Sequence, residues 1–255
     1  MSAPYRVLQI EDSADDALFN LRQLQRQGLC VAVSKRVETA TQMHGALASS
    51  PWDFIICDYQ MPCFNGLEAL ALYQETGLDI PFIVVSGWIG EAQAVRLIKS
   101  GAHEFIMKDN LDELGPAVRR ELRAAEDRNA RRCAQEHDAL LARIVRDCND
   151  AIFGATLEGS VVSWNKGAER LYGYTAAEIV GGPSALLEAP NQPSPQAAVL
   201  KQLRSGLPVA HFHTLHVRKN KTTVEVSLTI SPVKEPRGRI IGASTISQKI
   251  ADHPE

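Results

Sequence analysis

The sequence places three acidic residues, a serine and a lysine directly after four separate apolar runs. Glu11 and Asp12 follow the run RVLQI, and Asp58 follows DFIIC. Ser86 follows PFIVV, and Lys108 follows EFIM. Carboxylates held together repel one another unless a cation joins them, because two like charges about 4 Å apart cost several kcal/mol even at an effective dielectric constant of about 20. These residue types can therefore bind a divalent cation together with the oxygens of a phosphoryl group.

Mg²⁺ is the cation that this set favours. It prefers a few carboxylates plus water and leaves coordination positions open for phosphoryl oxygens. Lys108 and the Ser86 hydroxyl would supply further donors to a phosphoryl group carried by Asp58. Each residue taken alone has an ordinary explanation, since a single aspartate at a strand end is more often a cap or a surface group. The prediction depends on the ordered set.

The elements that would bring these residues together are strands of one sheet. Up to about residue 127, short apolar runs alternate with segments in which apolar residues recur three or four positions apart, which predicts a repeat of strands and helices. Runs that are apolar at consecutive positions fit strands covered on both faces, as in a parallel sheet flanked by helices. The carboxyl ends of such strands meet in one crevice. The runs are RVLQI, CVAVSKRV, DFIIC, PFIVV and EFIM.

The first predicted helix has clear ends. Ser13 followed by Asp16 is a capping-box pattern, and Gly28 marks the end of the helix. We expect its buried stripe to contain Leu18, Leu21 and Leu24.

The segments QIEDS, CDYQMPCFNGLE, PFIVVSG and EFIMK closely resemble the motifs of the response-regulator receiver family, over residues 5–125. The resemblance implies a doubly wound five-stranded sheet and phosphoryl transfer from the phosphohistidine of a histidine kinase to Asp58. It also implies that Ser86 and Lys108 assist this transfer, that Ser86 moves toward the phosphoryl group, and that Phe105 turns inward as a switch. The implied metal ligands are Glu11, Asp12, Asp58 and the backbone carbonyl of Gln60.

Two positions depart from the family pattern. Asp109 and Asn110 follow Lys108, where the family usually has proline, so we expect a loop of different shape before the last receiver helix. Phe105 replaces the more common tyrosine and therefore lacks a hydroxyl that could bond to partners.

The segment from about Leu111 to Asp150 is rich in Arg, Glu and Ala, which are strong helix formers. A helix over residues 117–149 would be about 50 Å long at about 1.5 Å per residue. Its apolar stripe is interrupted by Asn129 and Arg132, which predicts at most a marginal homodimer through this helical linker. The apolar positions are Val118, Leu122, Ala125, Leu140, Leu141, Ile144 and Val145.

The carboxyl-terminal part has the pattern of an α+β domain with an antiparallel sheet. AIFGATLEGSVVSW predicts a hairpin that turns at residues 158–160, and three longer strands follow two short helices. VVSWNKGAERLYGYTAAEIVG, VRKNKTTVEVSLTISPV and RIIGASTIS resemble a PAS domain. We expect Trp164 to close the second strand and Asn165 to cap the first short helix.

Known chromophore classes of PAS domains do not fit this sequence. A flavin adduct requires a cysteine in the helical region, but the last cysteine is Cys148, before the domain begins. The best-known haem PAS domains use a histidine on a long helix, and the corresponding segment, SPQAAVLKQLRSG, contains none. His211 and His213 should share one face of a strand and His216 the other, as ordinary strand histidines. We therefore expect no haem and no flavin adduct; another PAS ligand is left open.

We predict four segments: a receiver domain over residues 1–127, a helical linker over 128–138, a PAS domain over 139–250 and a tail over 251–255. The predicted function is a non-enzymatic phosphorelay, from a cognate histidine kinase through the linker and PAS domain to a downstream protein. The alternative is a fragment or accessory piece of a hybrid sensor histidine kinase. His137 superficially resembles a kinase phosphohistidine, but the Arg and Pro expected after it are absent, so a solvated helix histidine is the preferred interpretation.

Other classes are disfavoured. A hydrolase with an aspartate nucleophile would carry it after the first strand, and EDSADD replaces the glycine-rich turn of a nucleotide-binding domain. A net charge of −3 provides no field for nucleic acid, and no helix-turn-helix pattern appears. No apolar run approaches the about 20 residues that cross a membrane, so we expect a cytoplasmic protein. Its five cysteines show no CxxC spacing, which disfavours disulfides and zinc.

Overall fold

The structure is a computed structural model that describes residues 4–87, 89–189 and 210–250. The chain divides into two compact units, Met1–Ala134 and Gln135–Glu255. Within the described residues, no helix is both long and apolar enough to span a membrane.

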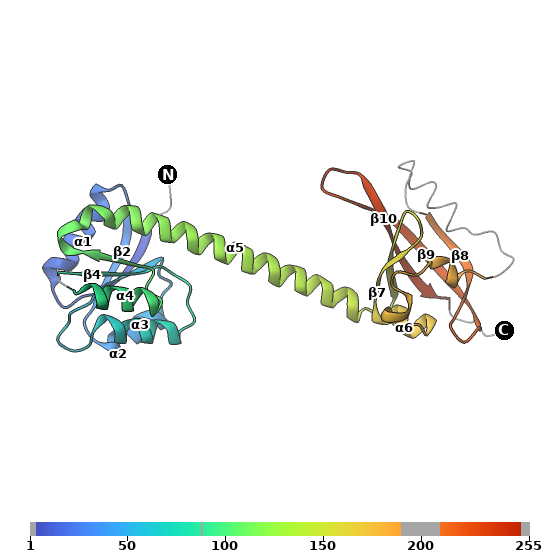
Figure 1. The fold of residues 1–255 in the computed structure, drawn as a ribbon, viewed down its shortest axis with the longest axis horizontal. Helices are drawn as coiled ribbons and strands as arrows, with labels where there is room; N and C mark the ends of the chain where they lie inside the picture. Colours follow the sequence, from blue (N-terminus) through green and yellow to red (C-terminus); the bar gives the residue numbers. More distant parts are fainter. Residues whose placement is uncertain (1–3, 88, 190–209, 251–255) are drawn as a thin grey trace. The chain divides into compact units, whose positions relative to one another are not determined.

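The first unit is the predicted α/β fold. Its five strands form one parallel sheet in the order β2-β1-β3-β4-β5, so the expectation of a doubly wound five-stranded sheet is confirmed. The elements are β1 (Tyr5–Ile10), α1 (Ala14–Arg26), β2 (Val31–Val37), α2 (Ala40–Ser49), β3 (Phe54–Asp58), α3 (Gly66–Glu75), β4 (Phe82–Ser86), α4 (Glu91–Lys99), β5 (Glu104–Met107), the 3₁₀ helix η1 (Lys108–Glu113) and α5 (Leu114–Asp147) (Figure 1).

Alternate residues of the central strands supply two separate cores. On β3, Ile55 and Cys57 pack with residues of α2, α3 and α4, whereas Phe54 and Ile56 pack with residues of α1 and α5. All five residues of β3 and all five of β4 are buried. Covering both faces explains the continuous apolar runs of these strands, and it places their polar carboxyl-terminal residues at one edge of the sheet.

Helix α1 corrects two sequence expectations. The Ser13 hydroxyl accepts from the Asp16 amide at 3.2 Å, but the Ser13 amide donates to Glu11 Oε1 at 3.1 Å, so only half of the capping box forms. The predicted buried stripe is correct for Leu24, which is buried, and for Leu21, which packs against the core, but wrong for Leu18, which is 45% exposed. The inward face of the helix carries Ala17, Asn20 and Leu24.

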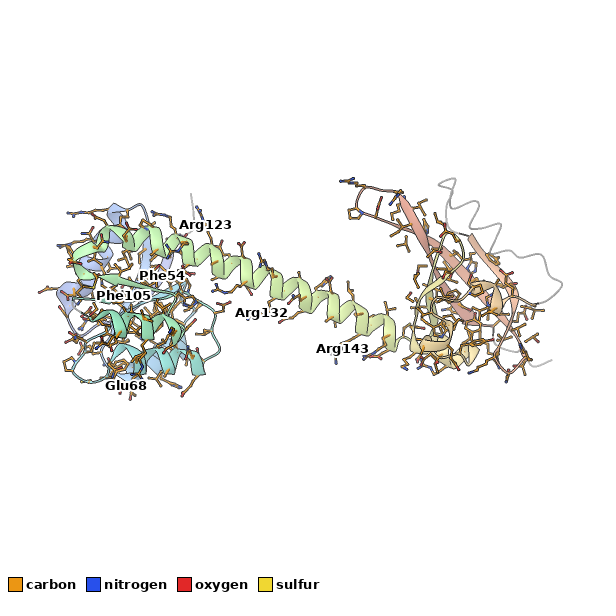
Figure 2. The ribbon with its side chains drawn as sticks, in the orientation of Figure 1. Phe54, Glu68, Phe105, Arg123, Arg132 and Arg143 are labelled. Atoms are coloured by element: carbon orange, nitrogen blue, oxygen red, sulfur yellow. The ribbon has the colours of Figure 1, made fainter. Side chains whose placement is uncertain are left out.

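Helix α5 is continuous from Leu114 to Asp147, which confirms the long helix expected over residues 117–149. Its first part belongs to the core of the first unit, where Val118 and Leu122 are buried; residues 126–147 are exposed. Arg128 forms an ion pair with Asp79 at 2.7 Å just beyond the buried part. Figure 2 shows the side chains of Arg123, Arg132 and Arg143 spaced along the helix.

The second unit is the predicted α+β fold with an antiparallel sheet, in the order β7-β6-β10-β9-β8. The hairpin turns where expected, with the Thr156 amide donating to the Ser160 carbonyl at 2.8 Å and Gly159 at a φ of 87°. The elements are β6 (Ala151–Thr156), β7 (Val161–Trp164), α6 (Lys166–Tyr172), α7 (Ala176–Ile179), the 3₁₀ helix η2 (Ser184–Leu187), β8 (Ala210–Val217), β9 (Thr223–Lys234) and β10 (Ile240–Lys249).

The core of the second unit is aromatic, with the rings of Phe153, Trp164 and Tyr172 in mutual contact. Trp164 ends β7, and the Asn165 side chain accepts from the Ala168 amide at 2.8 Å, so both structural predictions are confirmed.

The histidines of β8 alternate as expected. His211 and His213 are exposed, whereas His216 is 2% exposed and its Nδ1 lies 2.7 Å from the Tyr172 hydroxyl. That hydroxyl also lies 2.7 Å from Ser247 Oγ. The segment SPQAAVLKQLRSG lies outside the described residues.

Candidate functional site

Lys108 lies among three carboxylates at the carboxyl-terminal edge of the first sheet. Its Nζ is 2.5 Å from Asp16 Oδ2, 2.7 Å from Asp58 Oδ2 and 3.6 Å from Glu11 Oε2. These residues come from four places in the chain. Glu11 and Asp58 lie at the ends of β1 and β3, Asp16 lies in the first turn of α1, and Lys108 follows β5. The parallel topology therefore brings Glu11, Asp58 and Lys108 together as predicted.

The acidic group differs from the predicted one by one member. Oxygens of Glu11, Asp16 and Asp58 all lie within 4.8 Å of one another. Asp12 is not part of this group; its side chain is exposed, and its carbonyl oxygen accepts from Arg36. Asp16 was missed as a site residue because its spacing from Ser13 was interpreted only as a cap. The available signal was an acidic residue one helical turn beyond Ser13, on the face of α1 that turns toward the sheet.

Two further predicted residues have polar atoms suited to a phosphoryl group. Ser86 is fully buried, and its Oγ has no hydrogen-bond partner among the residues that the structure describes. An unpaired buried hydroxyl costs about 1–3 kcal/mol, and such groups are rare without a function. The Gln60 amide donates to Asp58 Oδ1 at 3.1 Å, which brings the main chain of Gln60 next to the candidate phosphoacceptor.

The two residues that depart from the family pattern after Lys108, Asp109 and Asn110, lie in a 3₁₀ helix. Lys108 begins the 3₁₀ helix η1, within which Asn110 has non-helical dihedral angles (φ −122°, ψ 42°). Phe105 is half-buried and packs against the core beneath α2, α3 and α4; Figure 2 labels it within this domain. A hollow of about 250 Å³ lies beside it, lined by residues of β5, η1 and α5 that include Met107 and Ala117.

The charges of the site are perturbed in opposite directions. Burial raises the pKa of Glu11 to about 7, a hydrogen bond from the Ser13 amide opposes this rise, and the nearby charge of Asp58 adds to it. Burial disfavours the charged form of Lys108, but hydrogen bonds to Asp16 and Asp58 outweigh burial and hold its pKa above the ordinary value. The lysine therefore remains cationic while Glu11 is half-protonated near neutral pH.

This donor set fits Mg²⁺. The ion prefers carboxylate oxygens and needs open positions for water and phosphoryl oxygens. Glu11, Asp16 and Asp58 provide the carboxylates, and the buried Ser86 hydroxyl, which has no partner among the described residues, is a polar group suited to a phosphoryl oxygen. When bound, the ion would neutralise charge that Lys108 alone leaves uncompensated.

Glu11→Gln should stabilise the metal-free protein at pH 8 by about 1–3 kcal/mol and by much less at pH 5. The pKa of Glu11 in the folded state, about 7, exceeds its ordinary value of 4.5. Between these values the folded state keeps a proton that the unfolded state has lost, so stability falls as pH rises through this window. Urea unfolding in a chelating buffer at both pH values measures the difference. An equal effect of the substitution at pH 5 and pH 8 would contradict the expected titration.

The family comparisons agree with this architecture. Residues 7–119 match the family model described as the response regulator receiver domain, and residues 149–250 match that described as the PAS domain. The chain is a receiver domain followed by a PAS domain. Glu11, Asp58, Ser86 and Lys108 all fall within the matched receiver region. A receiver domain implies phosphorelay signalling and a cognate histidine kinase.

Similar proteins cover parts of the chain. The C4-dicarboxylate transport transcriptional regulatory protein DctD of Pseudomonas aeruginosa is 30% identical over 150 residues, which are 56% of this chain and 31% of the relative. The transcriptional regulatory protein QseB of Haemophilus influenzae is 30% identical over 103 residues, which are 40% of this chain and 45% of the relative. The chain thus spans less than half the length of these curated relatives.

Solved structures resemble each domain separately. The signal receiver domain of a putative Luxo repressor protein from Vibrio parahaemolyticus is 25% identical, with a TM-score of 0.45, covering 50% of this chain and 97% of that one. The PAS domain of a protein from Colwellia psychrerythraea is 22% identical, with a TM-score of 0.42, covering 44% of this chain and 95% of that one.

Proposed function

We propose that the receiver domain accepts a phosphoryl group on Asp58 from the phosphohistidine of a histidine kinase. The observation that carries this proposal is the Asp58 carboxylate, 6% exposed, in contact with Lys108 at the same sheet edge as the Ser86 hydroxyl, for which the described part of the chain offers no hydrogen-bond partner. An Asp58 oxygen attacks phosphorus, the new P–O bond forms as the P–N bond breaks, and the imidazole leaves with the bond's electron pair. Hydrolysis later restores the carboxylate and releases phosphate.

The residues around Asp58 have different roles in this transfer. Lys108 stays protonated and binds a phosphoryl oxygen, and Ser86 donates its hydroxyl hydrogen to another. Mg²⁺, when bound by the acidic residues, reduces the charge repulsion between the phosphodonor and the carboxylates. Asp12 and the Gln60 carbonyl remain candidate ligands of that ion. Movement of Ser86 toward the phosphoryl group would free space for Phe105 to turn inward.

Labelling of the intact chain tests the proposal. With Mg²⁺ and a small phosphodonor such as phosphoramidate, the protein should gain one phosphoryl group, and peptide mapping should place it on Asp58. A folded protein that gains none, or that carries the group at another residue, would reject the proposal.

The kinase-docking surface is proposed to include the exposed side of α1. Leu18 and Phe19 are 45% and 46% exposed, and they lie on the helix that carries Asp16 into the site. Adjacent exposed apolar side chains next to a reactive group favour a protein contact. The partner must approach this edge closely, because its phosphohistidine has to reach the largely buried Asp58.

Phe19→Asp should slow transfer from the cognate phosphorylated kinase at least tenfold and leave labelling by phosphoramidate unchanged. An aspartate in the contact would lose apolar burial and would have to be desolvated on binding. Leu78→Asp is the matched control, since Leu78 is 42% exposed and precedes β4 at the opposite end of the strands. Equal slowing in both variants, or slower labelling by phosphoramidate, would contradict the proposal that the kinase docks on α1.

Helix α5 and the PAS domain are proposed to relay the phosphorylation state to a downstream protein. Leu140, Leu141, Ile144 and Val145 are between 44% and 59% exposed near the end of α5. An apolar hollow of about 410 Å³ continues from Leu141 and Val145 to Ile152 and Trp164 of the PAS domain. Association of two copies through this surface would be marginal, so a change of about 1.4 kcal/mol would shift the association constant tenfold.

Beryllofluoride, a phosphoryl mimic, should therefore change the self-association or the domain orientation of the intact protein. Sedimentation and small-angle scattering at several concentrations measure both. Leu141→Glu should abolish a change in association, because the charge would be buried in the contact. Identical profiles with the mimic bound would indicate that α5 is a passive spacer.

The complete proposal is a cytoplasmic, non-enzymatic relay that needs Mg²⁺ and a kinase but no haem or flavin adduct. An absorption band of either chromophore at stoichiometric level in purified protein would contradict the last point. The alternative, an accessory piece of a hybrid sensor histidine kinase, would keep the same receiver chemistry. His137 is exposed on α5 and its labelling by ATP or by a kinase would favour that alternative.

A further inference from the structure

The Asp16 carboxylate does not form the helix-capping hydrogen bond that its position in α1 would allow. As the third residue of α1, its carboxylate is placed to accept from the Ser13 amide and complete the capping box. The Ser13 amide instead donates to Glu11 Oε1 at 3.1 Å. Asp16 Oδ2 is directed at Lys108 Nζ, 2.5 Å away and 92 positions along the chain. The side chain is thus engaged by the site and not by its own helix.

Lys108 is shared between Asp16 and Asp58. Both carboxylates contact the same ammonium group, at 2.5 Å and 2.7 Å. A lysine side chain has four flexible carbons and about 2 kcal/mol of rotamer entropy, so a single contact leaves it poorly positioned. Phosphorylation converts the Asp58 carboxylate into an acyl phosphate, so the partner of Lys108 at this position changes from a carboxylate oxygen to a phosphoryl oxygen. Asp16 is chemically unchanged by this reaction and can hold Lys108 before and after transfer.

We propose that Asp16 is a positioning residue that holds the Lys108 ammonium group beside Asp58 throughout phosphoryl transfer. This inference rests on the proposed phosphorylation of Asp58. A second observation marks the same edge of the sheet as a ligand site, because within the described residues the fully buried Ser86 hydroxyl at the end of β4 has no hydrogen-bond partner. The proposed role differs from a general effect of negative charge, which would act without Lys108 and would repel an anionic phosphodonor.

Positioning of Lys108 and a general charge effect predict opposite signs for Asp16→Asn, and the Lys108→Met cycle separates positioning from loss of a Mg²⁺ carboxylate, which would also slow labelling. Loss of a positioning contact should slow labelling by phosphoramidate about threefold to tenfold, a range that allows for the 44% exposure of the Asp16 side chain. Loss of mere negative charge should accelerate labelling. Asp15→Asn is the matched control, because Asp15 is an exposed acid in the same first turn and the substitution changes the net charge equally. Asp16→Glu keeps the charge and should recover part of the rate.

A double-mutant cycle with Lys108→Met completes the test. If Asp16 acts through the lysine, Asp16→Asn should have no further effect when Lys108→Met is present. In metal-free protein, the NMR signal of the Lys108 ammonium group should be protected from exchange in the wild type and in Asp15→Asn, and should broaden or disappear in Asp16→Asn.

The inference is overturned if Asp16→Asn behaves like Asp15→Asn, if it accelerates labelling, or if its effect persists with Lys108→Met. An unchanged ammonium signal in Asp16→Asn would overturn it as well. Failure of the proposed function itself would look different, since the wild-type protein would then gain no phosphoryl group and the ammonium signals would still report the Lys108 contact.

Discussion

Asp58→Asn should abolish labelling of the receiver domain by phosphoramidate, with no detectable phosphoryl group gained. The amide that replaces the carboxylate is a poor nucleophile and removes one charge from the group that would bind Mg²⁺. The substitution preserves the shape of a side chain that is 6% exposed, and the amide oxygen can still accept from the Gln60 backbone amide. The loss would therefore be chemical and would not follow from unfolding.

Intact-protein mass spectrometry and unfolding curves check this result together. Asp15→Asn, which removes an acid outside the contact group, should label at the wild-type rate or faster. Labelling of the variant at the full wild-type rate would show that another residue is the acceptor.

The receiver site could be predicted from the sequence to the extent that strand ends determine it. Glu11, Asp58 and Lys108 converge because each lies at the carboxyl end of a strand of one parallel sheet, and these strands are visible in the sequence as short apolar runs. Asp16 could not be assigned by the same argument, because its orientation depends on which of two acceptors the Ser13 amide chooses. That choice is a competition between hydrogen bonds of similar free energy, and spacing does not encode it.

The exposure of Leu18, which the predicted buried stripe of α1 included, has a related cause. Leucine is apolar at positions 18, 21 and 24, yet the helix buries Ala17 and Asn20 and leaves Leu18 half-exposed. A small apolar residue and a polar one are weak signals of burial, so the pattern of leucines dominated the prediction. The rotation of the helix is instead set by packing against the sheet. It leaves Leu18 and Phe19 on the outer surface, where a partner protein would explain them.

The sequence does not reveal which helical glycines can be replaced by a larger residue. Gly167 and Gly45 both lie inside helices, where an isolated glycine normally lowers stability by about 1 kcal/mol relative to alanine. Propensity alone would predict that alanine is favourable at both positions. The structure shows that the two positions differ in the space available for a side chain. Gly45 has open space around it, whereas Gly167 lies against the backbone that leads from α5 into β6.

Gly167→Ala should therefore destabilise the PAS domain by about 3 kcal/mol or more. A Cβ atom at this position would overlap the carbonyl oxygen of Asp150 and lie 2.7 Å from that of Asn149. Both atoms belong to the main chain and cannot rotate away as a flexible side chain would. The same stretch is fixed by Asn165, whose side-chain amide donates to the Val145 and Asp150 carbonyls at 2.9 Å, so relief of the overlap would break the junction between α5 and the PAS core.

Calorimetry of the intact chain distinguishes this overlap from a general effect of the substitution. Two compact units should give two unfolding transitions, and Gly167→Ala should lower only that of the PAS domain, by more than about 10 °C. Gly45→Ala makes the same chemical change in α2 of the receiver domain. It should stabilise that domain by about 0.5–1 kcal/mol and so raise its transition temperature slightly. An unshifted or raised PAS transition in Gly167→Ala would mean that the α5–β6 junction yields easily. A junction that adjusts so easily would not be rigid enough to transmit a change in the receiver domain along α5. That result would argue against a relay through the helix.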